Sequence, residues 1–135
     1  MILVDANVLL DVVTRDPNWM VWSLNQLRTA AMSQQLAINS IVYAELSPGY
    51  ERPEEVDELV AGLGLDMLDI PRPALFLAGK VFRKYRARGG PKTGVLPDFF
   101  IGAHAAVSGL PLLTRDRARY ATYFPDVQLI APEQS

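Results

Sequence analysis

The chain begins with an apolar run that ends at an acid. Ile2, Leu3 and Val4 show no polar alternation, and Asp5 follows them directly. An unbroken apolar run with β-branched residues is typical of a strand buried on both faces, as in a parallel sheet. An acid directly behind such a strand lies at the sheet edge where open α/β domains bind ligands. Because an unpaired buried charge is costly, we expect Asp5 to hold a cation.

Further apolar runs alternate with segments whose apolar residues recur at helical spacing. The predicted strands are 2–4, 36–39, 67–70, 110–113 and 127–130. The predicted helices are 8–12, 20–31, 41–46, 53–63, 71–88, 98–107 and 117–123. This order predicts one α/β domain over residues 1–135, with a mostly parallel central sheet of about five short strands flanked by helices. We expect the tail at 132–135 to fray.

Polar residues in front of the helices predict how they begin. We expect Asn7, Asn18 and Ser40 to act as N-caps. Asp98 opens a later helix, where it either caps the helix or places a carboxylate beside the preceding loop. That loop, 90–97, is rich in glycine and proline, and we expect it to be irregular and mobile.

Composition narrows the class of protein. Half of the 135 residues are apolar, the net charge is −2 and there is no cysteine. These values indicate a globular domain without disulfides or thiolate metal sites, and they fit a reducing cytoplasm. No apolar run approaches the ~20 residues of a membrane-spanning helix, so we expect no membrane association. The charge argues against general coating of nucleic acid but leaves room for a local basic patch.

Four acids follow strands or open helices: Asp5, Glu45, Asp98 and Asp116. Glu45 has apolar neighbours one turn into its helix, although that segment alone is equally consistent with a solvent-facing position. Two carboxylates about 5 Å apart repel by roughly 3 kcal/mol at an effective dielectric near 20, so converging acids need shared protons or a cation. All-oxygen ligation favours Mg²⁺ or Mn²⁺, which serve phosphate chemistry by activating a water and clamping the phosphate.

Several other side chains could assist or surround such a site. Asn7 and Thr114 offer an amide and a hydroxyl that can orient a carboxylate, a water or a phosphate oxygen. His104 stands alone on a helix among alanines, which is typical of a packed residue, and we leave it out of the catalytic set. For Trp19 and Trp22 the spacing favours core or interface packing over a ligand role.

A basic stretch ends the helix at 71–88. It carries Arg83, Lys84, Arg86 and Arg88, with Lys92 just beyond, and no acid stands among them. One interpretation is a solvated face whose cations suit the helix C-terminus. The other is a track for an RNA phosphate backbone, which gains weight only if something else implicates nucleic acid.

Together these motifs resemble a PIN-domain ribonuclease, and among these the VapC toxins of bacterial and archaeal toxin–antitoxin pairs. The resemblance covers essentially the whole chain, from Asp5-Ala6-Asn7 through Glu45 and the helix of Asp98 to Thr114-Arg115-Asp116. It implies an endoribonuclease dependent on Mg²⁺ or Mn²⁺ that leaves a 5′-phosphate and a 3′-hydroxyl. Asp5, Glu45, Asp98 and Asp116 would bind the metal, and Asn7 and Thr114 would assist.

The resemblance also implies partners. VapC-like proteins typically form homodimers and are silenced by a cognate antitoxin, and the basic stretch would then be an RNA-binding surface comprising Arg83, Lys84, Arg86, Arg88 and Lys92. In one respect the chain departs from the pattern. Some relatives carry a further acid after the last motif, where this chain has Arg117 and Arg119, which puts a second metal site in question.

Other classes fit less well. Phosphatases of the haloacid dehalogenase class need a second acid where Asn7 stands, and a dinucleotide-binding domain needs a glycine-rich loop after the first strand. A non-catalytic RNA- or protein-binding module on the same fold is the alternative from another class, and its expected mark is loss of one or more acids. All four acids are present, which favours the enzyme. The sequence does not identify the RNA that would be cleaved.

Overall fold

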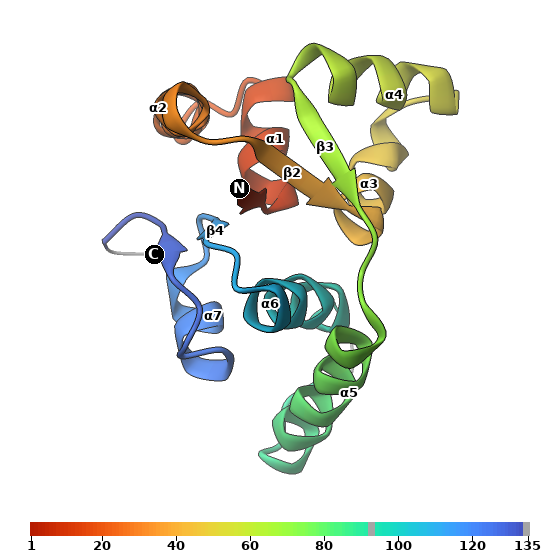
Figure 1. Ribbon diagram of the computed structural model, residues 1–135, viewed down its shortest axis with the longest axis vertical. Helices are drawn as coiled ribbons and strands as arrows, with labels where there is room; N and C mark the ends of the chain where they lie inside the picture. The colour runs from red at the N-terminus through yellow and green to blue at the C-terminus, as the bar shows by residue number, and fades with distance from the viewer. Residues whose placement is uncertain (92–93, 134–135) are drawn as a thin grey trace.

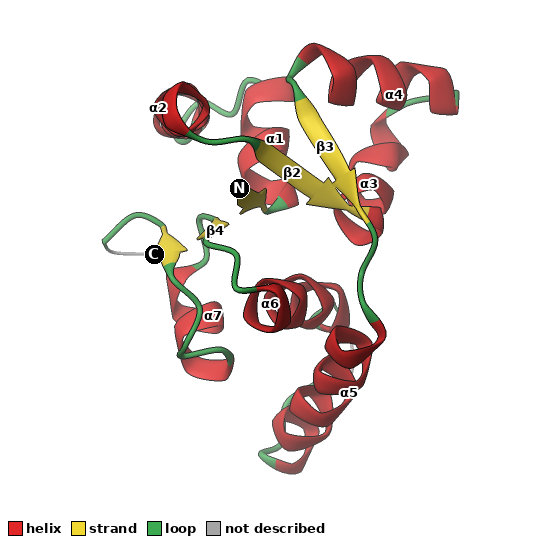
Figure 2. Ribbon diagram, in the orientation of Figure 1, coloured by secondary structure: helices red, strands yellow, loops and turns green. Residues whose placement is uncertain are grey.

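The computed structural model describes residues 1–91 and 94–133. Within these ranges the strands are Ile2–Val4 (β1), Leu36–Asn39 (β2), Leu65–Leu68 (β3), Leu112–Leu113 (β4) and Leu129–Ile130 (β5). The α-helices are Ala6–Val13 (α1), Met20–Ser33 (α2), Ser40–Leu46 (α3), Pro53–Gly62 (α4), Arg72–Ala87 (α5), Leu96–Ser108 (α6) and Arg117–Tyr123 (α7). A short 3₁₀ helix, η1, covers Ser47–Gly49. Figure 2 shows the helices in red and the strands in yellow. The predicted α/β class is confirmed.

The five strands form one sheet in the order β3-β2-β1-β4-β5, and every pairing is parallel. The central strand is therefore β1, which pairs with β2 on one side and with β4 on the other. Val4 lies opposite Leu113, so the residues that follow them, Asp5 and Thr114, leave the sheet side by side. This register places two predicted site residues at one edge of the sheet.

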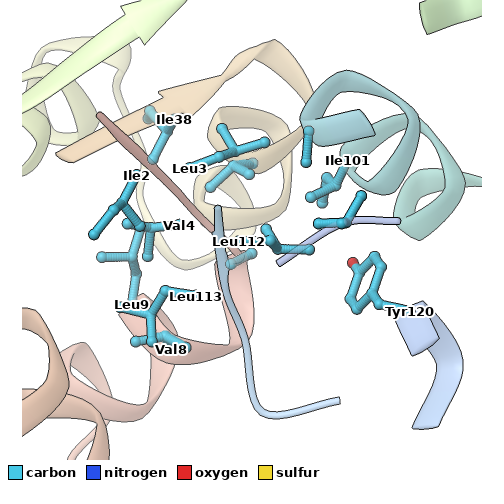
Figure 3. Packing of buried hydrophobic residues seen from close by; sticks show 14 of the residues in the cluster. Ile2, Leu3, Val4, Val8, Leu9, Ile38, Ile101, Leu112, Leu113 and Tyr120 are labelled. Atoms are coloured by element: carbon cyan, nitrogen blue, oxygen red, sulfur yellow. The ribbon is translucent and has the colours of Figure 1, made fainter. Parts of the chain in front are cut away.

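Strands β1 and β4 are buried on both faces. Figure 3 shows Leu112 turned toward Ile101 and Tyr120, whereas Leu113 lies toward Val8. All five side chains are fully buried. Consecutive residues of a strand point to opposite faces, so a strand covered on both sides is apolar throughout, which is why the sequence shows no alternation here. Each such side chain contributes about 1.5–3 kcal/mol, and the packed centre fixes the point where Asp5 leaves β1.

Helix α6 is held between α5 and α7 by aromatic contacts. Helix α5 extends away from the sheet at the bottom of Figure 1 and packs along α6. Phe99 of α6 contacts Phe82 and Tyr85 of α5, and Tyr123 and Phe124 at the end of α7, with ring centroids 5.1 to 6.2 Å apart. Such ring pairs add about 0.5–1.5 kcal/mol beyond the area that they bury. They fix the beginning of α6, where Asp98 lies.

Two predicted helix caps are wrong. Asn7 is the second residue of α1, and the N-cap position belongs to Asp5, whose side chain makes no capping hydrogen bond. Asn18 does not cap α2 either. Asp16 Oδ1 instead accepts hydrogen bonds of 2.9 Å from the backbone N–H groups of Asn18 and Trp19, so an aspartate turn sets the entry to the helix.

The cap of α3 also differs from the prediction. Ser40 is the first helical residue, and Asn39 precedes it as the N-cap. The Asn39 Oδ1 atom accepts hydrogen bonds from the N–H groups of Ile41 at 3.1 Å and Val42 at 3.0 Å. The last residue of β2 therefore also begins the helix that carries Glu45.

Some boundaries shift for identifiable reasons. Strand β3 begins two residues before the predicted start, because it is an edge strand whose Asp66 and Met67 are exposed. Helix α6 begins at Leu96 inside the segment predicted as irregular, with proline in its first turn, where proline is tolerated. Helix α5 buries Ala74, Ala78 and Val81, whereas Leu75 is exposed. No helix among the described residues is long and apolar enough to span a membrane.

Candidate metal centre

Three of the four predicted acids converge at the carboxyl edge of the sheet. Asp5 follows β1, Glu45 lies in α3, and Asp98 lies in the first turn of α6. Each contributes an oxygen atom that lies within 4.8 Å of the others. Asp116 does not belong to this group among the described residues and instead caps α7, where its Oδ1 accepts from the N–H of Arg119 at 3.2 Å. We call Asp5, Glu45 and Asp98 the acid cluster.

Asp5 is the anchored member of the acid cluster. Its side chain is buried, and its Oδ2 accepts hydrogen bonds from Thr114 Oγ1 at 2.8 Å and from the Tyr120 hydroxyl at 3.1 Å. The pKa of Asp5 is raised to about 6, chiefly by burial; the charge of Asp98 contributes to the rise, and the hydrogen bonds oppose it. The two donors therefore fix the carboxylate without compensating fully for its burial.

Glu45 is the unsatisfied member. Its Oε1 atom is buried and has no hydrogen-bond partner among the described residues. Burial raises the pKa of Glu45 to about 7, with added contributions from the charges of Asp5 and Asp98. A buried acceptor without a donor beside two further carboxylates needs a proton or a cation. The atoms that could bind a metal ion here are all carboxylate oxygens, so the cluster fits a hard divalent ion such as Mg²⁺ or Mn²⁺.

Thr114, which follows β4, and Asn7 of α1 form hydrogen bonds next to Asp5. The Asn7 amide donates to Thr114 Oγ1 over a long 3.5 Å, and its Oδ1 accepts from the Arg115 N–H at 3.3 Å. Thr114 Oγ1 also accepts from the N–H of Asp116 at 3.1 Å. The threonine hydroxyl therefore receives two N–H groups and donates to Asp5, which fixes the direction of its hydrogen. In this geometry Thr114 orients Asp5.

Asp98 and Asp116 share one cationic side chain. Nη1 of Arg119 donates to Asp98 Oδ2, and Nε of Arg119 lies 3.9 Å from Asp116 Oδ2. Burial raises the pKa of Asp98, the charge of Asp116 adds to this rise, and the hydrogen bond and charge of Arg119 oppose it. The guanidinium therefore stands between the acid cluster and the fourth acid.

His104 is buried away from the acid cluster and pairs with Asn39. Its Nδ1 lies 3.1 Å from the Asn39 Nδ2 atom. Since Asn39 Oδ1 receives the N–H groups of α3, its Nδ2 is the side that donates, and His104 Nδ1 must be the unprotonated acceptor. Burial lowers the pKa of His104, which agrees with a neutral ring. The histidine therefore supports the N-cap of the helix that carries Glu45.

Sequence reasoning missed Tyr120 and the role of Asn39, and it noted Arg119 only as standing where some relatives have a further acid. Tyr120 lies four residues after Asp116, so helical spacing places it one turn along α7 from a predicted site residue. Nothing in the sequence shows that this turn faces β1 rather than solvent. Trp22 packs against the core as predicted. Trp19 instead contacts the ring of Trp22, and the Arg115 guanidinium lies 5.0 Å from its ring centroid.

The basic stretch lies on the exposed side of α5. Arg83, Lys84, Arg86 and Arg88 are all exposed, and among the described residues none of them forms an ion pair with an acid. Arg86 donates to the carbonyl oxygen of Gly90 at 2.6 Å, which ties it to the end of the helix. Lys92, predicted with this group, lies outside the described residues.

Fold and site together define an α/β protein with a candidate divalent-metal centre at the carboxyl edge of a parallel sheet. The family model described as PIN domain matches residues 2–125. The chain therefore belongs to the PIN domain family, as the sequence motifs predicted. Comparison with curated protein sequences gave no significant match.

Solved structures share this fold. VapBC2 from Rickettsia felis, bound to a DNA fragment from its promoter, aligns with a TM-score of 0.73 at 22% identity, covering 98% of this chain and 100% of that chain. VapBC-1 from nontypeable Haemophilus influenzae aligns with a TM-score of 0.71 at 19% identity, covering 97% and 98%. DNA-bound VapBC from Salmonella typhimurium aligns with a TM-score of 0.66 at 23% identity, covering 97% of this chain and 98% of that chain.

Proposed function

We propose that this PIN-domain protein is an endoribonuclease that depends on Mg²⁺ or Mn²⁺ and acts in the cytoplasm as the toxin of a VapBC-type pair. The observation that carries the proposal is the acid cluster, whose three carboxylates approach within 4.8 Å while one Glu45 oxygen lacks a donor. The PIN domain match supports the same chemistry. Cleavage would leave a 5′-phosphate and a 3′-hydroxyl.

The side chains divide the work in this proposal. Asp5, Glu45 and Asp98 hold the ion, which when bound supplies positive charge to the phosphate and activates the attacking water. Thr114 and Tyr120 hold Asp5 in place, and Asn7 supports Thr114. Because the pKa of Glu45 is about 7, a large fraction of this side chain is protonated at neutral pH, and ion binding would release that proton.

We further propose that an antitoxin protein silences the chain and that the chain forms a homodimer. The solved structures with this fold include VapBC from three bacteria and a toxin–antitoxin complex from Klebsiella pneumoniae, which supports a partner of this kind. We expect induced expression of the chain alone to arrest bacterial growth and Asp5→Asn to abolish the arrest. We also expect sedimentation equilibrium to give twice the 14.9 kDa chain mass. Normal growth with the wild-type chain, or a monomer mass, would contradict these two points.

The nuclease is tested on labelled structured RNA with partner-free protein. Wild type, Asp5→Asn and Asp66→Asn are compared in Mg²⁺, in Mn²⁺ and in EDTA, and the product ends are tested for a 5′-phosphate. Asp66 is an exposed acid of β3 away from the acid cluster, so its variant controls for loss of one negative charge. We expect cleavage by wild type and Asp66→Asn with either ion, and none by Asp5→Asn or in EDTA.

Two results would contradict the proposal. Cleavage that survives both EDTA and Asp5→Asn would come from another site or a contaminant. Binding of varied RNAs without cleavage, together with no binding of Mn²⁺, would favour a non-catalytic RNA-binding module on the same fold.

A further inference from the structure

The side chain of Arg119 occupies the space between two acids of the site. Nη1 contacts Asp98 Oδ2 and Nε lies 3.9 Å from Asp116 Oδ2, while its own backbone N–H is bonded to Asp116 Oδ1. The arginine is thus tied to Asp116 through both main chain and side chain. The Arg119 side chain is one-third exposed, so it lies at the rim of the site rather than in the core.

The position of Arg119 is set by the helix that carries it. Asp116 caps α7, and Tyr120, the residue after Arg119, is fully buried with its hydroxyl on Asp5. Tyr120 and Asp116 therefore fix the rotation of the helix about its axis, and Arg119 is directed at Asp98. A guanidinium stays protonated at any physiological pH and presents several N–H donors in a plane, so it can hold two carboxylates at once.

Charge balance separates two ways of neutralising the four acids. A single divalent ion at the acid cluster leaves Asp98 partly and Asp116 wholly uncompensated. A second divalent ion between Asp98 and Asp116 would compensate them, but the guanidinium already lies on the carboxylate oxygens that such an ion would need. Two cations cannot share this space without strong repulsion at a few ångströms.

We propose that Arg119 is a built-in cation in the place of a second metal ion, so that the chain binds one divalent ion per molecule. The inference rests on the proposed metal-dependent function. Arg119 is a positioning residue in this scheme, because it orients Asp98 toward the acid cluster and keeps Asp116 from recruiting an ion. Asp98 is then shared between the ion on one side and the guanidinium on the other.

Mn²⁺ binding measures the proposal directly, without RNA or turnover. Free Mn²⁺ is followed by electron paramagnetic resonance during titration of wild type, Arg119→Gln, Arg119→Lys and Arg117→Gln. Arg117 lies on the same helix, and its guanidinium donates to the carbonyl oxygens of residues 131 and 132, so its variant removes an equal charge elsewhere. Thermal unfolding of each variant confirms that the fold is retained.

We expect one ion per wild-type chain, one in Arg117→Gln and Arg119→Lys, and two in Arg119→Gln, where Asp98 and Asp116 are released. Adding Asp116→Asn to Arg119→Gln should return the number of bound ions per chain to one. Two ions in wild type, or one in both wild type and Arg119→Gln, would overturn the inference and leave the metal centre standing. An ion in Arg119→Gln but none in wild type would overturn it as well, because Arg119 would then exclude the first ion. No ion in any variant would overturn both the inference and the proposed function.

Discussion

Ionisation of the Glu45 side chain destabilises the folded state. Its Oε1 is buried without a donor, and burial together with the charges of Asp5 and Asp98 raises its pKa from near 4.5 to about 7. A carboxyl whose pKa is higher in the folded state than in the unfolded chain holds its proton more tightly when folded. Its contribution to stability is therefore complete below pH 4.5 and is lost as the pH rises through 7.

This sign gives a prediction for Glu45→Gln in EDTA. Glutamine has no charge to bury, so the variant should match wild type near pH 4 and be the more stable protein at pH 8. Urea unfolding at a series of pH values measures the difference. Glu58→Gln on the exposed side of α4 is the matched control and should show no such trend.

Added Mn²⁺ should reverse the order at pH 8, because wild type gains ligand-binding stabilisation that Glu45→Gln loses in part. If the difference in unfolding free energy between wild type and Glu45→Gln is the same from pH 4 to pH 8, ionisation of Glu45 does not destabilise the folded state.

At this scale the sequence indicates some roles and hides others. Asp5 could be predicted because an acid directly behind a buried strand has few structural uses. Thr114 follows from the repetition of that pattern near the other end of the chain. Tyr120 could not be assigned, since its hydroxyl reaches Asp5 only through the way α7 packs against the sheet. The same is true of Asn39, whose amide both caps α3 and meets His104.

Among the elements, α6 is the helix whose packing sets the site. Gly102 lies on its buried side, and a Cβ atom at this position would overlap the ring of Phe124. Gly79 is also within a helix, α5, but has open space where a Cβ would stand. Both glycines occur in regular helices, but only Gly79 has room for a Cβ atom.

We expect the two alanine substitutions to have opposite signs. Gly102→Ala should destabilise the protein by about 1–3 kcal/mol, because the ring of Phe124 must move and α6 must shift with it. Gly79→Ala should stabilise by up to about 1 kcal/mol, since alanine is the better helix former. Chemical unfolding of both variants measures this. Equal effects would show that the contact with Phe124 does not restrain α6.

Elements were predictable where the pattern is internally consistent. The sequence predicts strands β1 and β2 and helix α7 at the bounds that the structure has, because fully buried strands and short helices with a clear start carry strong signals. The predicted start of the edge strand β3 differs from the observed start by two residues, since exposed Asp66 and Met67 give the strand no apolar alternation. The beginning of α6 was missed because proline in a first turn is read from sequence as irregular chain.

At the scale of the whole molecule, the exposed cations of α5 lie on an overall acidic protein. The net charge is −2, yet Arg83, Lys84, Arg86 and Arg88 face solvent without acidic partners among the described residues. This asymmetry supports the proposed RNA-binding surface, because phosphate contacts act through local rather than total charge.

Neutralising Arg83 and Lys84 together should weaken RNA binding and reduce its dependence on salt. On single-stranded RNA each phosphate contact contributes about 0.7 to the slope of log K against log salt, so the slope should fall by about 1.4. Binding is measured in EDTA to prevent cleavage. The control neutralises Arg28 and Arg52, exposed cations on α2 and before α4. Equal losses in the two double variants would show that α5 is not the RNA-binding surface.

The placement of β1 at the centre of the sheet has a consequence for how the protein is made. Asp5 is synthesised well before its two hydrogen-bond donors, which lie 109 and 115 residues further on. At a synthesis rate of about 5–20 residues per second, a ribosome takes roughly 5 to 20 seconds to pass from Asp5 to these donors. Throughout that interval β1 lacks β4 on one side and Asp5 lacks the groups that hold it. The site is therefore completed only after the whole segment from Asp5 to Tyr120 has been synthesised.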